Sequence, residues 1–250
     1  MSGLPAEADP SATAPIGLLS AVRRDAVGVG IATGAYGLSF GALAVTSGFS
    51  PLQAQVLSLA LFSGASQFAA VGIVAAGGGA AAAIGTALLL GTRNGLYGLT
   101  LSGLLPLRRW SRLAAAQLTI DESTAMAVSR DEPGQRTLIG PAFWWTGASV
   151  FVFWNLATLI GAMAASQFDD PRVLGLDAAV PAAFLALLWP RLRDRTTRSV
   201  AAAAGVVALI LTPVLSPGLP VLFSALIAVA VGLWPHHRGA APSGPANGAS

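Results

Sequence analysis

The sequence contains no cysteine and no lysine, and only 10% of its 250 residues are charged. The absence of cysteine excludes disulfides, thiol chemistry and cysteine-based metal sites. A soluble domain carries roughly 25% charged residues, so the low charge excludes an ordinary soluble domain. With 54% hydrophobic residues and a mean hydropathy of +0.68, the composition predicts an all-α integral membrane protein. We expect a polytopic helical bundle with about six crossings plus one or two broken or re-entrant helices.

The signatures of common catalytic centres are also missing. The sequence has no P-loop, no G-x-S-x-G and no H-E-x-x-H motif, so any transport is not powered by ATP hydrolysis in this chain. Its two histidines, His236 and His237, lie in a polar segment after the last apolar run, where we expect a solvated flank. The residues therefore predict no enzyme, no cofactor and no metal site.

All basic residues are arginine, and they cluster in short segments beside apolar runs. Positively charged loops remain on the cytoplasmic side of a membrane, so this placement explains the pI near 10.5 better than nucleic-acid binding does. The clusters lie at 23–24, 108–112 and 191–198. We expect a multi-pass protein of the cell or inner membrane with both termini in the cytoplasm. Residues 22–235 are predicted to be the transmembrane domain, between disordered tails at 1–21 and 236–250.

The apolar runs are the candidate membrane segments. They lie at 26–47, 52–76, 80–105, 138–167, 173–189, 200–214 and 219–234. In the first, Gly30/Gly34 and Gly37/Gly41 are pairs of small residues that allow close helix packing, which is favoured here over ligand contact. The run at 113–128 is short for a crossing, and we interpret it as a re-entrant or interfacial helix.

The stretch from Leu61 to Leu101 is interrupted twice by polar clusters, at 63–67 and at 92–95. Broken backbone inside a bilayer is tolerated only where protein or a water-filled cavity covers it, and two such segments indicate a transporter's binding site. Three apolar runs separate two cytoplasmic arginine clusters, so one run must not cross fully. A re-entrant hairpin broken at either cluster satisfies this, and the sequence leaves both possibilities open.

The first cluster is a candidate binding site for an anionic group. A helix break frees backbone N–H groups, and these, with the helix dipole, attract a carboxylate. The alternative is a kink packed against a neighbouring helix. The candidate residues are Ser63, Gly64, Ser66 and Gln67.

The second cluster places Arg93 and Asn94 inside an apolar run. A guanidinium presents a fixed fork of donors to a carboxylate and stays charged. Arg93 is therefore expected either to hold a substrate carboxylate or to form a structural ion pair with Asp121 or Glu122.

Asp121 and Glu122 are adjacent acids in an apolar setting. On a helix they point about 100° apart, so one is expected to face inward and one to face the interface. Burial raises the pKa of a carboxyl group, which suits proton coupling near neutral pH. The alternative is a helix start, with Thr119 or Asp121 as the N-cap and an acid in the first turn.

Several segments, in this order, resemble those of the AzlC-type branched-chain amino acid permeases. They are FSGASQFAAVGI at 62–73, TRNGLYGLTLS at 92–102, LTIDESTA at 118–125 and LGLDAAVPAAFLALLWPRL at 174–192. Members of that family typically carry asparagine-x-arginine-histidine shortly before a tyrosine. Aligned on Tyr97, Arg93 keeps the arginine, but Gly91 replaces the asparagine and Asn94 the histidine, so a histidine role does not carry over.

The resemblance implies a function. It implies export of leucine, isoleucine, valine and similar amino acids, driven by the proton gradient or the membrane potential, with a small AzlD-type membrane subunit as partner. A glycine-rich apolar lining suits a branched aliphatic side chain. Two alternatives belong to other classes: a scaffold subunit whose partner forms the pathway, and, more weakly, a membrane enzyme acting through Asp121 and Glu122, which lack an accompanying nucleophile–base pair.

Overall fold

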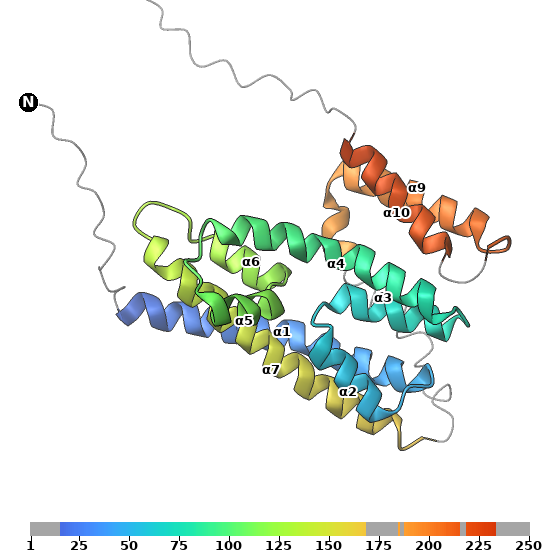
Figure 1. The fold of residues 1–250 in the computed structure, drawn as a ribbon, viewed down its shortest axis with the longest axis horizontal. Helices are drawn as coiled ribbons and strands as arrows, with labels where there is room; N and C mark the ends of the chain where they lie inside the picture. The colour runs from blue at the N-terminus through green and yellow to red at the C-terminus, as the bar shows by residue number, and fades with distance from the viewer. Residues whose placement is uncertain (1–15, 169–184, 186–187, 216–218, 234–250) are drawn as a thin grey trace, which may run out of the picture. The chain divides into compact units, whose positions relative to one another are not determined.

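The computed structural model describes residues 16–168, 185, 188–215 and 219–233, and every regular element in these ranges is a helix (Figure 1). The chain forms two compact units, Met1–Leu188 and Trp189–Ser250. The helices of the first unit are α1 (Ile16–Thr46), α2 (Pro51–Ala60), α3 (Gly64–Ala75), α4 (Ala80–Ser102), α5 (Arg109–Leu118), α6 (Asp121–Val128), the 3-10 helix η1 (Arg136–Leu138) and α7 (Ile139–Ala165).

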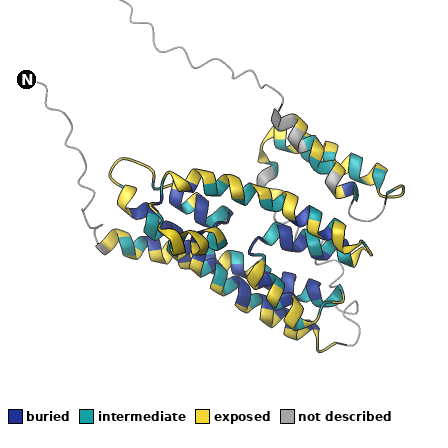
Figure 2. Cartoon of the chain, in the orientation of Figure 1, coloured by how far each residue is buried: buried dark blue, intermediate teal, exposed yellow. Residues whose placement is uncertain are grey.

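Helices α1 and α7 form the central pair of the first unit. Segments Gly17–Thr46 and Arg136–Ala165 are long and apolar enough to cross a membrane, with mean hydropathies of 1.4 and 1.7. Figure 2 shows buried residues along the helices that pack around this pair. Helix α1 begins at Ile16, so the last part of the segment predicted as a disordered tail, 16–21, is helical.

The two helices pack through glycines, as the small-residue pairs predict. A Cβ at Gly30 would overlap Ser149, one at Gly34 would overlap Phe153, and one at Gly41 would overlap the Thr158 carbonyl. A Cβ at Gly161 of α7 would likewise overlap the backbone of Leu38 on α1. The contacts advance together along both helices, so α1 and α7 run parallel.

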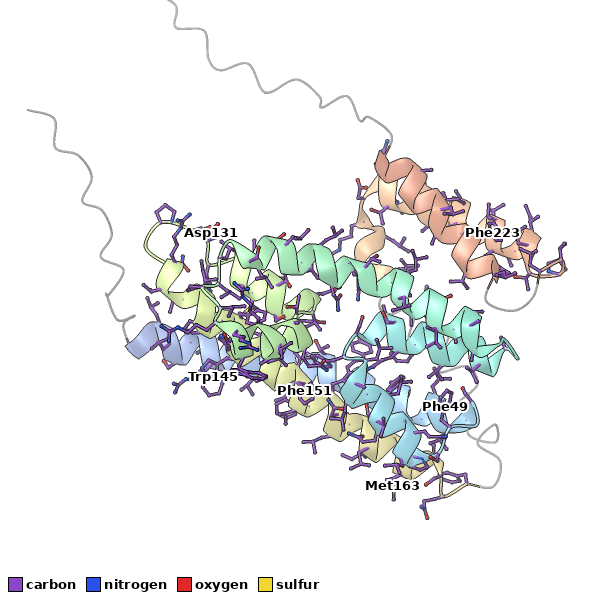
Figure 3. The ribbon with its side chains drawn as sticks, in the orientation of Figure 1. Phe49, Asp131, Trp145, Phe151, Met163 and Phe223 are labelled. Carbon is purple, nitrogen blue, oxygen red and sulfur yellow. The ribbon has the colours of Figure 1, made fainter. Side chains whose placement is uncertain are left out.

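Helices α2 and α3 form a hairpin that enters from the C-terminal end of α1. Ser50 caps α2, because its side chain accepts from the N–H of Gln53 while the Gln53 amide accepts from the N–H of Ser50. The hairpin turns at the break after α2, where the ring of Phe62 meets that of Phe151 at 5.0 Å between centroids. Phe151 is labelled midway along α7 in Figure 3. Of the two possibilities left open by the sequence, the structure has a helix break at the first cluster, between Ala60 and Gly64, with Ser66 and Gln67 already inside α3. That this segment does not cross the membrane fully stays a prediction.

Helix α4 is continuous, so the prediction of a second broken segment at 92–95 is wrong. Arg93 and Asn94 lie within regular helix, and their side chains are only half-buried. The helix begins after the turn at Gly77, whose φ of 78° suits glycine. It ends where Leu101 packs near Ile139 at the start of α7, so α4 runs antiparallel to α1.

The run at 113–128 is not one helix but parts of two, α5 and α6, and its break at Thr119–Ile120 was not predicted. Leu118 packs on Gly147 midway along α7, and Met126 then returns to the start of α1 and α7. The pair is therefore a second hairpin, entering from the end opposite to the first. The hairpin tips meet where Gln117 Nε2 donates to the Leu59 carbonyl at 2.8 Å.

The order of helices repeats in the first unit, although no repeat is convincing in the sequence. One long helix and two short ones (α1, α2, α3) are followed by the same order with the opposite direction (α4, α5, α6). Inverted repeats of this kind are common in secondary transporters, whose binding sites lie at the interface of the repeats. The second helix of each hairpin, α3 or α6, begins in the middle of the bundle.

Gln67 closes the break of the first hairpin. Its Oε1 accepts from Trp154 Nε1 at 3.0 Å, and its Nε2 donates to the carbonyls of Ser58 and Leu61. Gln67 is fully buried, so these bonds satisfy backbone groups that hydrocarbon cannot satisfy. This supports the alternative of a kink packed on a neighbouring helix.

The second unit contains η3 (Trp189–Arg193), α9 (Arg195–Leu211) and α10 (Leu219–Leu233), with α9 and α10 packed together. These helices match the predicted runs at 200–214 and 219–234. Asp194 caps α9, and its hydrogen bond from the N–H of Thr197 holds the pKa of the Asp194 carboxyl below its usual range. Most of the predicted run at 173–189 lies outside the described residues, and the single domain at 22–235 stays a prediction.

Replacing Gly41 with alanine is expected to lower the free energy of unfolding by about 1–3 kcal/mol, because the new methyl group overlaps the Thr158 carbonyl. Gly28→Ala is the matched control. Nothing lies within 4 Å of its added Cβ, so the better helix propensity of alanine should stabilise α1 by about 0.5–1 kcal/mol. Thermal unfolding of the detergent-solubilised variants measures both. Equal effects would contradict the close contact of α1 and α7.

Gln67→Leu is expected to destabilise the protein by about 3 kcal/mol, because it leaves buried partners on α2 and Trp154 unsatisfied. Gln167→Leu, at an exposed position, should leave the melting temperature nearly unchanged. The measurement is the melting temperature and the monodisperse fraction on size exclusion. A Gln67→Leu protein of normal stability that no longer handles substrate would instead assign Gln67 to binding.

Candidate substrate and coupling site

The candidate site is centred on an ion pair between α4 and α6. Arg93 Nη1 donates to Asp121 Oδ2 at 3.1 Å, and the two side chains are 29% and 24% exposed. Asp121 is the first residue of α6 and Ile120 is its N-cap, so neither Thr119 nor Asp121 takes the predicted N-cap position. The N-terminal end of α6 carries a partial positive charge that stabilises a carboxylate, and Arg93 adds a full charge to it.

Glu122 turns to a different helix. Its Oε1 accepts from Thr33 Oγ1 of α1 at 3.5 Å. The two acids diverge, as their helical spacing requires, but both contact neighbouring helices and both are half-buried. The expectation that one of them faces inward and one faces the membrane interface stays a prediction. The first turn of α6 joins α4 to α1 through two carboxylates.

Several polar atoms beside this ion pair are buried without a hydrogen-bond partner among the described residues. They are Arg93 Nε and Asn94 Oδ1 of α4, and Thr124 Oγ1 of α6. Buried polar atoms are normally satisfied by protein or by water, and an unsatisfied group costs about 1–3 kcal/mol. The cluster therefore has unused capacity to bind a small polar molecule.

The predicted residues of the first break divide into two groups. Gly64 packs against the indole of Trp154, with its Cβ position 3.0 Å from the ring, and Gln67 is fully engaged as described above. Ser63 donates to Ser66 at 3.1 Å and does not cap α3. The Ser66 hydroxyl lies 3.8 Å from the Cβ position of Gly91 on α4, so it faces the helix that carries Arg93.

The N-terminal ends of α3 and α6 differ in charge. Helix α6 has Asp121 and Glu122 in its first turn, whereas α3 has no acid there and no side-chain cap. The end of α3 is therefore the more favourable of the two for an anion. Among the described residues, no group of three His, Cys, Asp or Glu side chains could hold a metal ion.

Sequence reasoning missed Thr33, Thr124 and Trp154, which contact or flank the predicted residues. A signal existed for Thr33, because it lies three residues after Gly30 and four before Gly37, on the glycine face of α1. Trp154 carried no signal for its bond to Gln67, because this contact joins helices that are distant in the sequence. The roles of the predicted site residues in binding and coupling stay predictions.

Comparison with known proteins identifies the family. The AzlC protein family matches residues 28–168. An uncharacterized membrane protein of Archaeoglobus fulgidus is 34% identical over 173 residues, which are 68% of this chain and 74% of that protein. The inner membrane protein YgaZ of Escherichia coli is 32% identical over 176 residues, 66% of this chain and 69% of that protein. No solved structure matches the chain. The protein is a membrane protein of the AzlC family.

Proposed function

We propose that this protein is the large subunit of a secondary transporter that exports branched-chain and similar apolar amino acids, driven by the proton gradient or the membrane potential. The observation that carries the proposal is the half-buried Arg93–Asp121 pair between a continuous helix and a broken one. Ionisable residues inside membrane segments are costly and mark substrate or ion pathways. Membership in the AzlC family supports a transport role.

In this proposal, the substrate binds by replacing Asp121 as the carboxylate partner of Arg93. An amino-acid carboxylate that approaches the α3 end competes with Asp121 for the guanidinium, which suits a bidentate carboxylate. The Nε of Arg93 has no partner among the described residues, so it is available for the second hydrogen bond. The Asp121 carboxylate, displaced from Arg93, would then attract the substrate's ammonium group by its charge.

Proton coupling is assigned to Glu122. Asp121 is committed to Arg93, whereas Glu122 meets a hydroxyl, Thr33, at the long distance of 3.5 Å. Taking up a proton at Glu122 would not require breaking an ion pair with Arg93. Glu122 is therefore the better carrier of the two.

A small AzlD-type subunit, implied by the resemblance, is expected to complete the transporter. Helix α9 has no buried residue and exposes Val206, Leu209 and Ile210. Such an apolar face requires lipid or another membrane helix as its neighbour.

Arg93→Ala is expected to abolish efflux of labelled leucine, valine and methionine from preloaded cells that also contain the small subunit. A charge swap, Arg93→Asp with Asp121→Arg, should restore the ion pair and the melting temperature but not efflux, because position 93 then repels a carboxylate. Arg136→Ala, which removes an exposed pair with Asp131, is the control and should transport normally.

The swap separates the two roles of Arg93. Recovery of efflux in the swapped protein would make the pair structural and would remove Arg93 from the binding site. An absence of efflux in the wild type, with both subunits in the membrane, would contradict the proposed substrate class and favour the scaffold alternative.

Glu122→Gln is expected to leave substrate binding intact and to flatten the dependence of efflux on external pH, because glutamine carries no proton. Glu132→Gln, in the exposed loop before η1, should keep the wild-type profile. The measurement is the initial rate of efflux at several external pH values. An unchanged pH profile in Glu122→Gln would contradict the coupling role and would leave Glu122 a structural role in the first turn of α6.

A further inference from the structure

A second candidate binding site of the first unit lies away from the ion pair, at the end of α4. A cavity of about 410 Å³ is bounded by α4, the loop after it, α5 and the start of α7. Its walls are mainly apolar, with Leu101, Leu105, Ala115 and Phe143 among them. The volume falls within the range of about 300–1,000 Å³ that is typical of ligand sites.

Arg112 is the charged residue in the lining of this cavity. Its Nε donates to the Leu107 carbonyl at 3.3 Å, which orients the guanidinium, and the residue is exposed. Arg108 and Arg109 lie on the same loop and helix start, and no acid pairs with any of the three among the described residues. By contrast, Arg24, Arg93, Arg130 and Arg136 all have carboxylate partners.

The loop also has the character of a membrane surface. Trp110 is 75% exposed and lies beside the Arg109 guanidinium, 5.6 Å from ring centroid to charge centre. Exposed tryptophan next to arginine is typical of the headgroup region of a bilayer. The cavity thus opens where lipid headgroups are expected.

We propose that this cavity binds an anionic phospholipid, with part of one acyl chain between α4 and α5 and the phosphate on Arg112 and its neighbouring arginines. Basic pockets between membrane helices recognise anionic headgroups through charge, and each buried methylene group adds to the affinity. The proposal does not depend on the transported substrate.

The lining distinguishes a lipid from an amino acid. No carboxylate lines the cavity, so the ammonium group of a zwitterionic amino acid would have no partner there. The hydroxyls of Ser102 and Thr119 are already engaged, because they donate to the carbonyls of Leu99 and Ala115. Unpaired positive charge beside an apolar volume fits a phosphate with an attached chain.

The site also touches the second hairpin. Thr119, in the lining, is the C-cap that follows α5, two positions before Asp121. A bound chain would therefore pack against the hairpin that carries both acids of the candidate site.

The test is native mass spectrometry of the protein extracted from membranes and then stripped stepwise with detergent. Wild type should retain an anionic phospholipid. Arg112→Gln should reduce retention about five-fold. Gly98→Phe, which fills the cavity from a position with nothing within 4 Å of its Cβ, should reduce it about ten-fold or more. Arg198→Gln and Gly85→Phe are the matched controls, an exposed arginine of α9 and an equally open glycine of α4.

Add-back experiments distinguish the sources of the phosphate. Phosphatidylglycerol should rebind to the stripped wild type and raise its melting temperature, whereas phosphatidylcholine and glycerol 1-phosphate should not. Equal retention by Gly98→Phe and Gly85→Phe, or equal rebinding of glycerol 1-phosphate, would overturn the proposal. A co-purified polypeptide of defined mass that Gly98→Phe displaces, in place of lipid, would assign the cavity to a protein partner and would also overturn it.

Discussion

The close backbone contact between α1 and α7 is the constraint on which the first unit depends. Gly30, Gly34 and Gly41 let the two helices approach so closely that a Cβ atom at any of these positions would overlap α7. Because the pair is parallel, the chain must return once between them, and α4 is the helix that does so. The space left on either side of α4 is filled by hairpins that enter from opposite ends.

The candidate site follows from that arrangement. Each hairpin places a helix N-terminus in the middle of the bundle, and α4 passes both of them with Ser66 opposite Gly91 and Arg93 on Asp121. A broken helix exposes backbone groups at a cost, which Gln67 offsets in the first hairpin and Ser123, accepting from the N–H of Ile120 and donating to carbonyls, offsets in the second. Hydrogen bonds within the protein therefore stabilise both breaks, and the charged side chains of Arg93 and Asp121 lie beside the second one.

The sequence was sufficient to predict the helical class and the glycine contact of α1. It offered the pairing of Arg93 with an acid as one of two roles, and it left the broken segment open between two polar clusters. It failed where non-local packing decides. Helix α4 stays continuous through Arg93 and Asn94, and the carboxylate that Arg93 meets comes from α6, a segment 28 positions away in the chain. The break at Thr119–Ile120 has no glycine to mark it, and it is set instead by the contact of Leu118 with Gly147. The bond of Gln67 to Trp154, a partner 87 positions away in the chain, was not predicted either, and the substrate-binding role of Gln67 stays a prediction.

The hydrogen bond from Gln117 to the Leu59 carbonyl joins the tips of the two hairpins. One side of it belongs to the hairpin that enters from one end, and the other side belongs to the hairpin that enters from the opposite end. Neither hairpin can withdraw toward its own end without losing a bond that also supports the other. A movement that breaks this bond at one hairpin therefore also removes a contact from the other, so the two hairpins are mechanically linked across the middle of the bundle.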